Sequence, residues 1–314
     1  MFNQQSTILS LCLMAAALPL PAKIIYFATT GLDTNPCTYA KPCKSFNAIA
    51  QGVITVNAGD TILALDGVDF NDQQSAPTFF INSVTIDGGA HGAFMTGIAE
   101  GAAVNFQGIA YSNFVLRNVT LVAPAGAGSQ GVAIYLNQGG TITMENVTVL
   151  LQGGSSTQGM FISNSGGSGT SVIHLDGVRV DGIGDGLFLQ TNSSTQVTAD
   201  NVSTDVTGTG MLILDGYGAV RNSNFRTTSA PGSTGLSLQP QFSSSILVDT
   251  CSFKNLQFGL TVGAGATVRI SNSAFSGNAT GVFNNSTGVA ISFRNNVFAG
   301  NGVDGAPTLT TSLK

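Results

Sequence analysis

Residues 142–149, ITMENVTV, alternate apolar and polar side chains, lose the alternation at Asn146, and then resume it. The same pattern recurs in FVLRNVTL (114–121), IHLDGVRV (173–180), VTADNVST (197–204), GAVRNSNF (218–225), ILVDTCSF (246–253), VRISNSAF (268–275) and ISFRNNVF (291–298). The central residues are Asn118, Asn146, Gly177, Asn201, Asn222, Thr250, Asn272 and Asn295. Asn and Gly best tolerate a left-handed backbone, so we expect a turn at this position in every repeat. The repeat favours this structural role over glycosylation, although Asn118, Asn146 and Asn201 fit acceptor sequons.

A second marker is a glycine that precedes a short apolar stretch in most repeats: Gly131, Gly159, Gly186, Gly210, Gly235, Gly259 and Gly281. Short strands without helical periodicity between them predict a parallel β-helix, in which equivalent residues stack about 4.8 Å apart. Asn side chains should then form a hydrogen-bonded ladder along the stack.

Alternation also assigns the faces of the predicted strands. We expect Val119, Val147, Val178, Val202 and Cys251 to point inward, and Phe225, Phe253, Phe275 and Phe298 to stack in the core. Residues 44–51, KSFNAIAQ, are expected to form a short helix that closes the N-terminal end, because a terminal rung otherwise exposes its core. The predicted organisation is a signal peptide (1–22), an N-terminal cap (23–52), a β-helix (53–306) and a C-terminal tail (307–314).

The N-terminal sequence indicates that the chain is exported. Residues 8–20, ILSLCLMAAALPL, are too short an apolar run to span a bilayer comfortably, and Ala22 is a small residue suited to signal cleavage. The preceding MFNQQ lacks the Lys or Arg usual in a signal peptide. We therefore expect a secreted protein, extracellular or periplasmic, with no transmembrane segment in the mature chain.

A net charge of −5 without a Lys/Arg run argues against nucleic acid as a partner.

Cys37 and Cys43 lie close together in NPCTYAKPCKSF. In an exported chain such a pair favours a disulfide over a redox or zinc site. Cys251 is left over, at an inward position of the repeat.

At these motifs the chain resembles secreted bacterial right-handed parallel β-helix repeat proteins of the pectin-lyase-like superfamily, a largely uncharacterised branch. FATTGLDTNPCTYAKPCKSFNAI resembles their N-terminal cap, and ATVRISNSAFSGNATGVFNN through ISFRNNVFAGNGVDGAP resembles their last two rungs. The resemblance implies an all-β fold, a single right-handed parallel β-helix with a short N-terminal helical cap. The Asn-Thr-Asp and Asp-Asp motifs of pectin-hydrolysing members are absent, and GAHG (89–92) and VRIS (268–271) only approach the Gly-His-Gly and Arg-Ile-Lys motifs. Hydrolysis by two carboxylates therefore lacks its usual signature.

Glu145, Asp176 and Asp200 occupy the outward position before the turn on three consecutive repeats, bracketed by Arg117 and Arg221. Such stacked carboxylates repel unless they are screened, protonated or bridged, and oxygen ligands of this kind suit Ca²⁺. Three readings stay open: a solvated column balanced by the arginines, a Ca²⁺ site that stiffens the helix, and a lyase site. In the lyase reading the cation neutralises a uronate, and Arg221 or Arg179 removes a proton, as in the similar pectate lyases.

The sequence favours a non-catalytic protein that binds or organises glycan or envelope material on a long strand face. A Ca²⁺-dependent polysaccharide (uronate) lyase is the alternative enzyme, and a structural or adhesive surface module is the third class.

Overall fold

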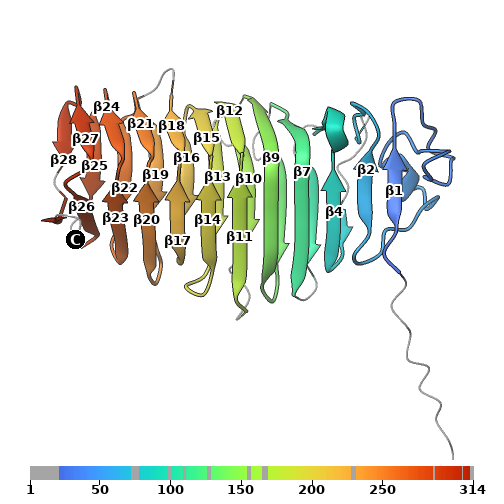
Figure 1. Ribbon diagram of the computed structural model, residues 1–314, viewed down its shortest axis with the longest axis horizontal. Coiled ribbons are helices and arrows are strands. Elements are labelled where there is room, and N and C mark those ends of the chain that lie inside the picture. Colours follow the sequence, from blue (N-terminus) through green and yellow to red (C-terminus); the bar gives the residue numbers. More distant parts are fainter. Residues whose placement is uncertain are drawn as a thin grey trace, which may run out of the picture.

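The structure is a computed structural model that describes residues 21–71, 78–97, 101–108, 111–125, 129–153, 157–164, 169–227, 231–285, 287–305 and 307–311. In this part of the chain the strands stack into a parallel solenoid, from the N-terminal cap in blue to the C-terminal end in red (Figure 1). One sheet has nineteen strands and the other has ten. The predicted signal peptide lies almost entirely outside the described residues. No helix of the described chain has the length and apolarity needed to cross a membrane.

The nineteen-stranded sheet bends at the predicted turn, so it has two arms. The first arm, before the turn, contains β1 (Ile24–Phe27), β2 (Thr61–Ala64), β4 (Ser83–Asp87), β11 (Ser171–Asp176), β14 (Gln196–Asp200), β17 (Gly216–Arg221), β20 (Ser244–Asp249), β23 (Ala266–Ser271), β26 (Val289–Phe293) and β29 (Leu309–Thr311). The second arm, after the turn, contains β5 (Ala93–Thr96), β12 (Arg179–Ile183), β15 (Ser203–Val206), β18 (Asn224–Arg226), β21 (Ser252–Lys254), β24 (Ala274–Ser276) and β27 (Val297–Ala299). Two strands, β7 (Ser112–Ala123) and β9 (Gly140–Gln152), run through both arms.

The ten-stranded sheet closes the third side of the solenoid. It contains β3 (Thr78–Phe80), β6 (Ala102–Gly108), β8 (Gln130–Leu136), β10 (Gln158–Ser163), β13 (Asp185–Gln190), β16 (Thr209–Ile213), β19 (Thr234–Leu238), β22 (Phe258–Val262), β25 (Thr280–Asn284) and β28 (Val303–Gly305). The seven glycines of the second sequence marker lie near the starts of β8 to β25 in this sheet, which explains why an apolar strand follows each of them.

The turn between the arms has the predicted left-handed backbone. The φ angles are 56° at Asn118, 54° at Asn146, 63° at Gly177, 53° at Asn201, 49° at Asn222, 55° at Thr250 and 48° at Asn272. Asn295 is the exception, because its φ is not positive. The pattern that breaks at one residue in ITMENVTV is therefore a turn required by the fold.

The predicted ladder of Asn–Asn hydrogen bonds is present at only some of the turns. Asn146 Nδ2 donates to Asn118 Oδ1 at 3.3 Å, and Asn295 Nδ2 donates to Asn272 Oδ1 at 2.7 Å. Where the strand of the previous rung ends in Asp, the turn amide donates to that carboxylate instead: Asn118 to Asp87, Asn201 to Asp176, Asn222 to Asp200 and Asn272 to Asp249. An ionised acceptor makes a stronger hydrogen bond than an amide oxygen, so the Asp competes successfully with the ladder.

The last repeat is shifted relative to the sequence alignment. Val268 pairs with Ala290, one residue before the Ile291 with which the repeat pattern aligns it, whereas Phe275 pairs with Phe298 as expected. One extra residue is therefore accommodated in the turn around Asn295. Asn296 secures this longer turn, because its Nδ2 donates to the carbonyl oxygens of Ile270 and Phe293.

The core follows the predicted faces. Val119, Val147, Val178, Val202 and Cys251 are all buried. The rings of Phe225, Phe253, Phe275 and Phe298 stack with centroids 5.1, 4.7 and 4.9 Å apart and interplanar angles of 6–8°. Phe298, on the last rung of the stack, is only partly buried.

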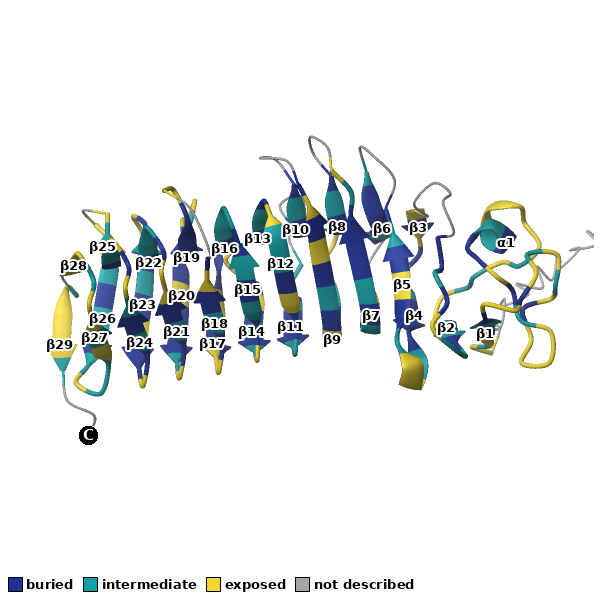
Figure 2. Cartoon of the chain, turned by 90° about the horizontal axis from the view of Figure 1, so that it is seen from above, coloured by how far each residue is buried: buried dark blue, intermediate teal, exposed yellow. Residues whose placement is uncertain are grey.

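A short helix closes the N-terminal end, as expected. Helix α1 (Asn47–Ala50) lies at this end, beside β1 and β2 (Figure 2), and it buries Ala48. The preceding Phe46 stacks on Phe70 with ring centroids 5.0 Å apart. The sheet nevertheless extends past the predicted limits of 53 and 306. Strand β1 of the predicted cap pairs with β2, and β29 of the predicted tail pairs with β26.

The cap also holds the Cys37–Cys43 disulfide, with the Cα atoms 4.6 Å apart, while Cys251 is a free, buried thiol. Burial raises the pKa of Cys251 to about 12. We expect no thiol of the native mature chain to react with a thiol reagent, because Cys251 is buried and protonated. After unfolding without reductant, one thiol should react, or two if Cys12 is retained. Three reactive thiols in the mature chain would contradict the disulfide.

Candidate functional site

The predicted acidic column has the expected register. Asp176 pairs with Glu145 on one side and with Asp200 on the other, and Arg117 and Arg221 flank the three acids. The described residues nevertheless contain no group of three His, Cys, Asp or Glu side chains that could hold a metal ion. Two of the carboxylates already accept hydrogen bonds from turn amides. Asp176 Oδ1 accepts from Asn201 at 3.0 Å, and Asp200 Oδ1 accepts from Asn222 at 2.8 Å. The arrangement supports the solvated column, and a Ca²⁺ site here stays a prediction.

The same column continues with acids that are held more firmly. Burial opposes ionisation of Asp87, but hydrogen bonds from Asn118, the Gly89 N–H and Arg117 outweigh it and place its pKa below the ordinary value. The hydrogen bond from Ser271 lowers the pKa of Asp249, with a further contribution from Asn272. Local hydrogen bonds therefore favour the ionised form of Asp87 and Asp249, which is consistent with a structural role for these two residues.

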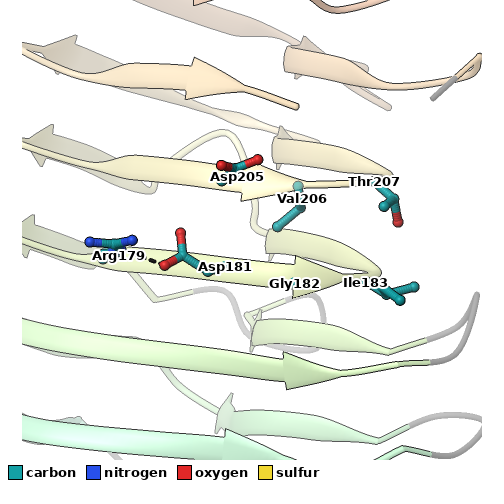
Figure 3. Close-up of a pocket in the computed structure, with 7 residues that line it drawn as sticks. All are labelled: Arg179, Asp181, Gly182, Ile183, Asp205, Val206 and Thr207. Carbon is teal, nitrogen blue, oxygen red and sulfur yellow. Dashed lines mark hydrogen bonds and ion pairs between the residues drawn. The ribbon is translucent and has the colours of Figure 1, made fainter. Parts of the chain in front are cut away.

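A second column of charges runs along the outer surface of the second arm. Asp181, Asp205, Arg226 and Lys254 pair in register on four consecutive rungs, and we call them the charged row. Asp181 accepts from Arg179 Nε at 2.5 Å, and Asp205 pairs with Arg226 Nε at 3.0 Å. Figure 3 shows Arg179 and Asp181 joined on one strand, with Asp205 above them on the next. Arg179, the candidate lyase base, is thus already paired with a carboxylate.

Two open cavities border the charged row and share Asp205. One has a volume of about 400 Å³ and is lined by Arg179, Asp181, Gly182, Ile183, Asp205, Val206 and Thr207 (Figure 3). The other has a volume of about 370 Å³ and is lined by Asp205, Arg226, Thr227, Lys254 and Asn255. The surface of the second arm is therefore recessed on both sides of Asp205.

The outer surface of the ten-stranded sheet carries a different set of side chains. Tyr135, Phe161 and Phe188 form one run, with ring centroids 5.6 and 5.5 Å apart, and Phe258 and Phe283 form a pair at 5.0 Å. We call these five residues the aromatic face. Tyr135, Phe161 and Phe188 point outward, because the residues on either side of them along the strands, such as Met160 and Ile162 beside Phe161, are buried. Phe258 precedes one buried residue, Gly259, and Phe283 follows one, Val282. All five rings are at least partly exposed, and Phe283 is 42% exposed.

Amide and hydroxyl groups surround the aromatic face. Gln130 Nε2 donates to Gln158 Oε1 at 3.1 Å, and Ser163 Oγ donates to Gln190 Oε1 at 3.5 Å. Each of these amides has hydrogen-bonding groups beyond the one used. The ten strands contain only two charged residues, Asp185 and Asp304. The sheet therefore presents an apolar stripe with neutral hydrogen-bonding groups at its sides.

The aromatic face was not predicted from the sequence, although a signal exists. The second residue after each marker glycine is Ala133, Phe161, Phe188, Leu212, Ser237, Thr261 or Phe283. This position alternates with two buried ones, so its apolar members had to face outward. Three of these seven residues are Phe, which distinguishes the position from an ordinary solvated surface.

Comparisons with known proteins support the fold. Residues 158–312 match the family model described as a right handed beta helix region. The pectate lyase Pel9A is similar in structure at 15% identity, with a TM-score of 0.58 over 91% of this chain and 79% of that one. A rhamnogalacturonan lyase (13% identity, 85% and 84% covered, TM-score 0.38) and an alginate lyase from Paenibacillus sp. str. FPU-7 (14% identity, 88% and 98% covered, TM-score 0.34) are more distant. A search of curated proteins finds no match. The chain therefore has a right-handed parallel β-helix fold, similar to that of the pectate lyase Pel9A.

Proposed function

We propose that this chain is an exported, non-catalytic β-helix that binds glycans on the outer surface of the ten-stranded sheet. The observation that carries the proposal is the aromatic face with its neighbouring amides. Sugar rings combine apolar C–H surfaces with hydroxyl groups, and binding sites for such ligands pair apolar or aromatic surface with a few placed polar groups. The fold neighbour Pel9A is by name a pectate lyase, so in that protein the same fold serves a polysaccharide.

The charges of this sheet favour a neutral glycan over an acidic one. Asp185 and Asp304 are the only charged residues of its ten strands, and both are acidic. A polyuronate would find no Lys or Arg in these strands to pair with its carboxylates, and it would be repelled by the two aspartates. Gln130, Gln158 and Gln190 can instead donate to and accept from neutral hydroxyl groups.

Export is supported by the sequence and by the cap. The apolar run of residues 8–20 has the length of the apolar region of a signal peptide, and the Cys37–Cys43 disulfide is typical of an oxidising compartment. A glycan-binding β-helix in that location would act on extracellular or envelope material.

Replacing Phe161 or Phe188 with alanine should weaken binding to neutral polysaccharides. Each change removes an apolar contact of about 1 kcal/mol, which corresponds to about a fivefold rise in Kd. The measurement is isothermal titration or affinity electrophoresis against soluble neutral and acidic polysaccharides, with purified mature protein. Phe94→Ala is the matched control, because Phe94 is 46% exposed and outward-facing but lies on β5 of the second arm.

The same assay separates the alternatives. Equal binding by the Phe161 and Phe94 variants would overturn the assignment of the site. Ca²⁺-dependent formation of unsaturated products from an acidic polysaccharide, abolished by Asp176→Asn, would favour the lyase and the predicted cation site. Absence of binding to all polysaccharides would leave the structural or adhesive module.

A further inference from the structure

We propose that two copies of this chain associate side by side, antiparallel, through the charged row on the second arm. The row reads acid, acid, base, base on consecutive rungs, in the order Asp181, Asp205, Arg226 and Lys254. The residues on the inward side of these strands, including Val180, Phe225 and Phe253, are buried, so the four charges project from the outer surface. This surface lies on a different sheet from the aromatic face, and the inference is independent of glycan binding.

The order of the charges makes the row complementary to itself. A two-fold dimer places the same patch of both subunits in contact, so that residue i meets residue j and j meets i. With the axis between the rungs of Asp205 and Arg226, Asp181 lies opposite the partner's Lys254, and Asp205 lies opposite the partner's Arg226. The spacing matches automatically, because both rows repeat at about 4.8 Å. A parallel arrangement in the same register would set like charges against each other, so the charges select the antiparallel one.

The basic end of the row has unused capacity for such contacts. Lys254 is exposed and makes no ion pair with any residue that the structure describes. At the other end, the Asp181 side chain is 22% exposed, and its Oδ2 accepts from Arg179 Nε. The antiparallel arrangement brings the unpaired Lys254 of one subunit towards this carboxylate of the other.

The surface around the row can also accommodate a second subunit. Ile183 is 53% exposed at the edge of the 400 Å³ cavity and supplies apolar area beside the charges. The two cavities on either side of Asp205 give room for the long side chains of Arg226 and Lys254 of the partner subunit. Charge therefore sets the orientation of the dimer, and the recesses permit close approach.

Two charge-reversed variants test the proposal. Asp181→Lys/Asp205→Lys makes the row entirely basic, and Arg226→Glu/Lys254→Glu makes it entirely acidic. In sedimentation velocity, the native chain should dimerise at micromolar concentration and dissociate as salt increases, because the contacts are exposed to solvent. Each double variant alone should dimerise about 100-fold more weakly, since every contact becomes a like-charge contact. An equimolar mixture of the two should restore association as a heterodimer.

Lys41→Glu, an exposed charge reversal in the cap, is the control and should leave association unchanged. A native chain that remains monomeric, or folded variants that fail to associate when mixed, would overturn the proposal. Circular dichroism and melting curves check that the variants fold. If a double variant does not fold, Lys254→Glu alone should still weaken the native dimer, and an unchanged dimer in that variant would equally refute the inference.

Discussion

Replacing Phe253 with alanine is expected to lower the free energy of unfolding by about 3–5 kcal/mol. The Phe253 ring is fully buried and lies between Phe225 and Phe275, with centroids 5.1 and 4.7 Å away and nearly parallel planes. Alanine would leave a cavity between two rings whose backbones are fixed by strand pairing, so the neighbours cannot close it. The cost therefore includes the lost transfer free energy and the cavity.

Urea denaturation followed by circular dichroism measures this effect. In a solenoid each rung contacts only its neighbours, so a weak rung in the middle also reduces the coupling between the two halves. We expect a lower midpoint and, if the halves separate, a shallower transition. Phe242→Ala is the control, because Phe242 is 76% exposed, and it should change stability by less than about 0.5 kcal/mol. A similar loss in both variants would mean that the Phe stack is not the stabilising element.

The turn and the core were predictable from the sequence because a solenoid repeats them. The left-handed position selects Asn or Gly in nearly every rung, and the inward position after it selects an apolar side chain, so register and face follow from the alignment alone. The register predicted from the sequence was less accurate where a feature occurs in a single rung. The shift between Val268 and Ala290 results from one additional residue in a turn, which an alignment of equal-length segments cannot show.

The hydrogen bonds along the turn could not be predicted from the Asn column in isolation. The partner of each amide depends on which residue ends the strand of the previous rung. On the rung before Asn222 the strand ends in Asp200, and Asn222 donates to that carboxylate. On the rung before Asn146 the residue before the turn is Arg117, and Asn146 donates to the turn residue Asn118 instead. The same fact changes the interpretation of the acidic column. The carboxylates of Asp176 and Asp200 resemble metal ligands in the sequence, but in the structure they accept hydrogen bonds from turn amides.

The charged row was visible in the sequence but was not recognised. Asp181, Asp205, Arg226 and Lys254 each stand four residues after the turn position of their repeat. The residue before each of them in the sequence is buried, so strand alternation predicts that this position faces outward, as it does for the residue before the turn. The recesses beside it depend on the local shape of several rungs and have no counterpart in a sequence pattern.

Gly235→Ala is expected to destabilise the fold by about 1–3 kcal/mol, a large effect for one methyl group. A Cβ atom at Gly235 would lie 2.6 Å from the carbonyl oxygen of Gly259 and 2.7 Å from Cδ1 of Phe253. Both distances are too short for a non-bonded contact. Gly235 does not have a left-handed φ, so the cost arises from contact and not from backbone conformation. The sequence marker thus reflects a glycine column that lies directly against the Phe stack.

Strand pairing limits how far this contact can relax. Leu236 pairs with Leu260 in the ten-stranded sheet, so the Gly259 carbonyl cannot withdraw without breaking a parallel ladder. If the ring were the main obstacle, combining Gly235→Ala with Phe253→Leu would restore stability, because the smaller side chain vacates the space. We expect no such rescue, since the backbone contact persists, and the double-mutant cycle in urea measures the coupling. Gly67→Ala, at an exposed glycine with no atom within 4 Å of the added methyl, should be neutral or slightly stabilising. An equally small effect at Gly235 would show that the rungs can separate, and that the glycine column is not a packing requirement of this solenoid.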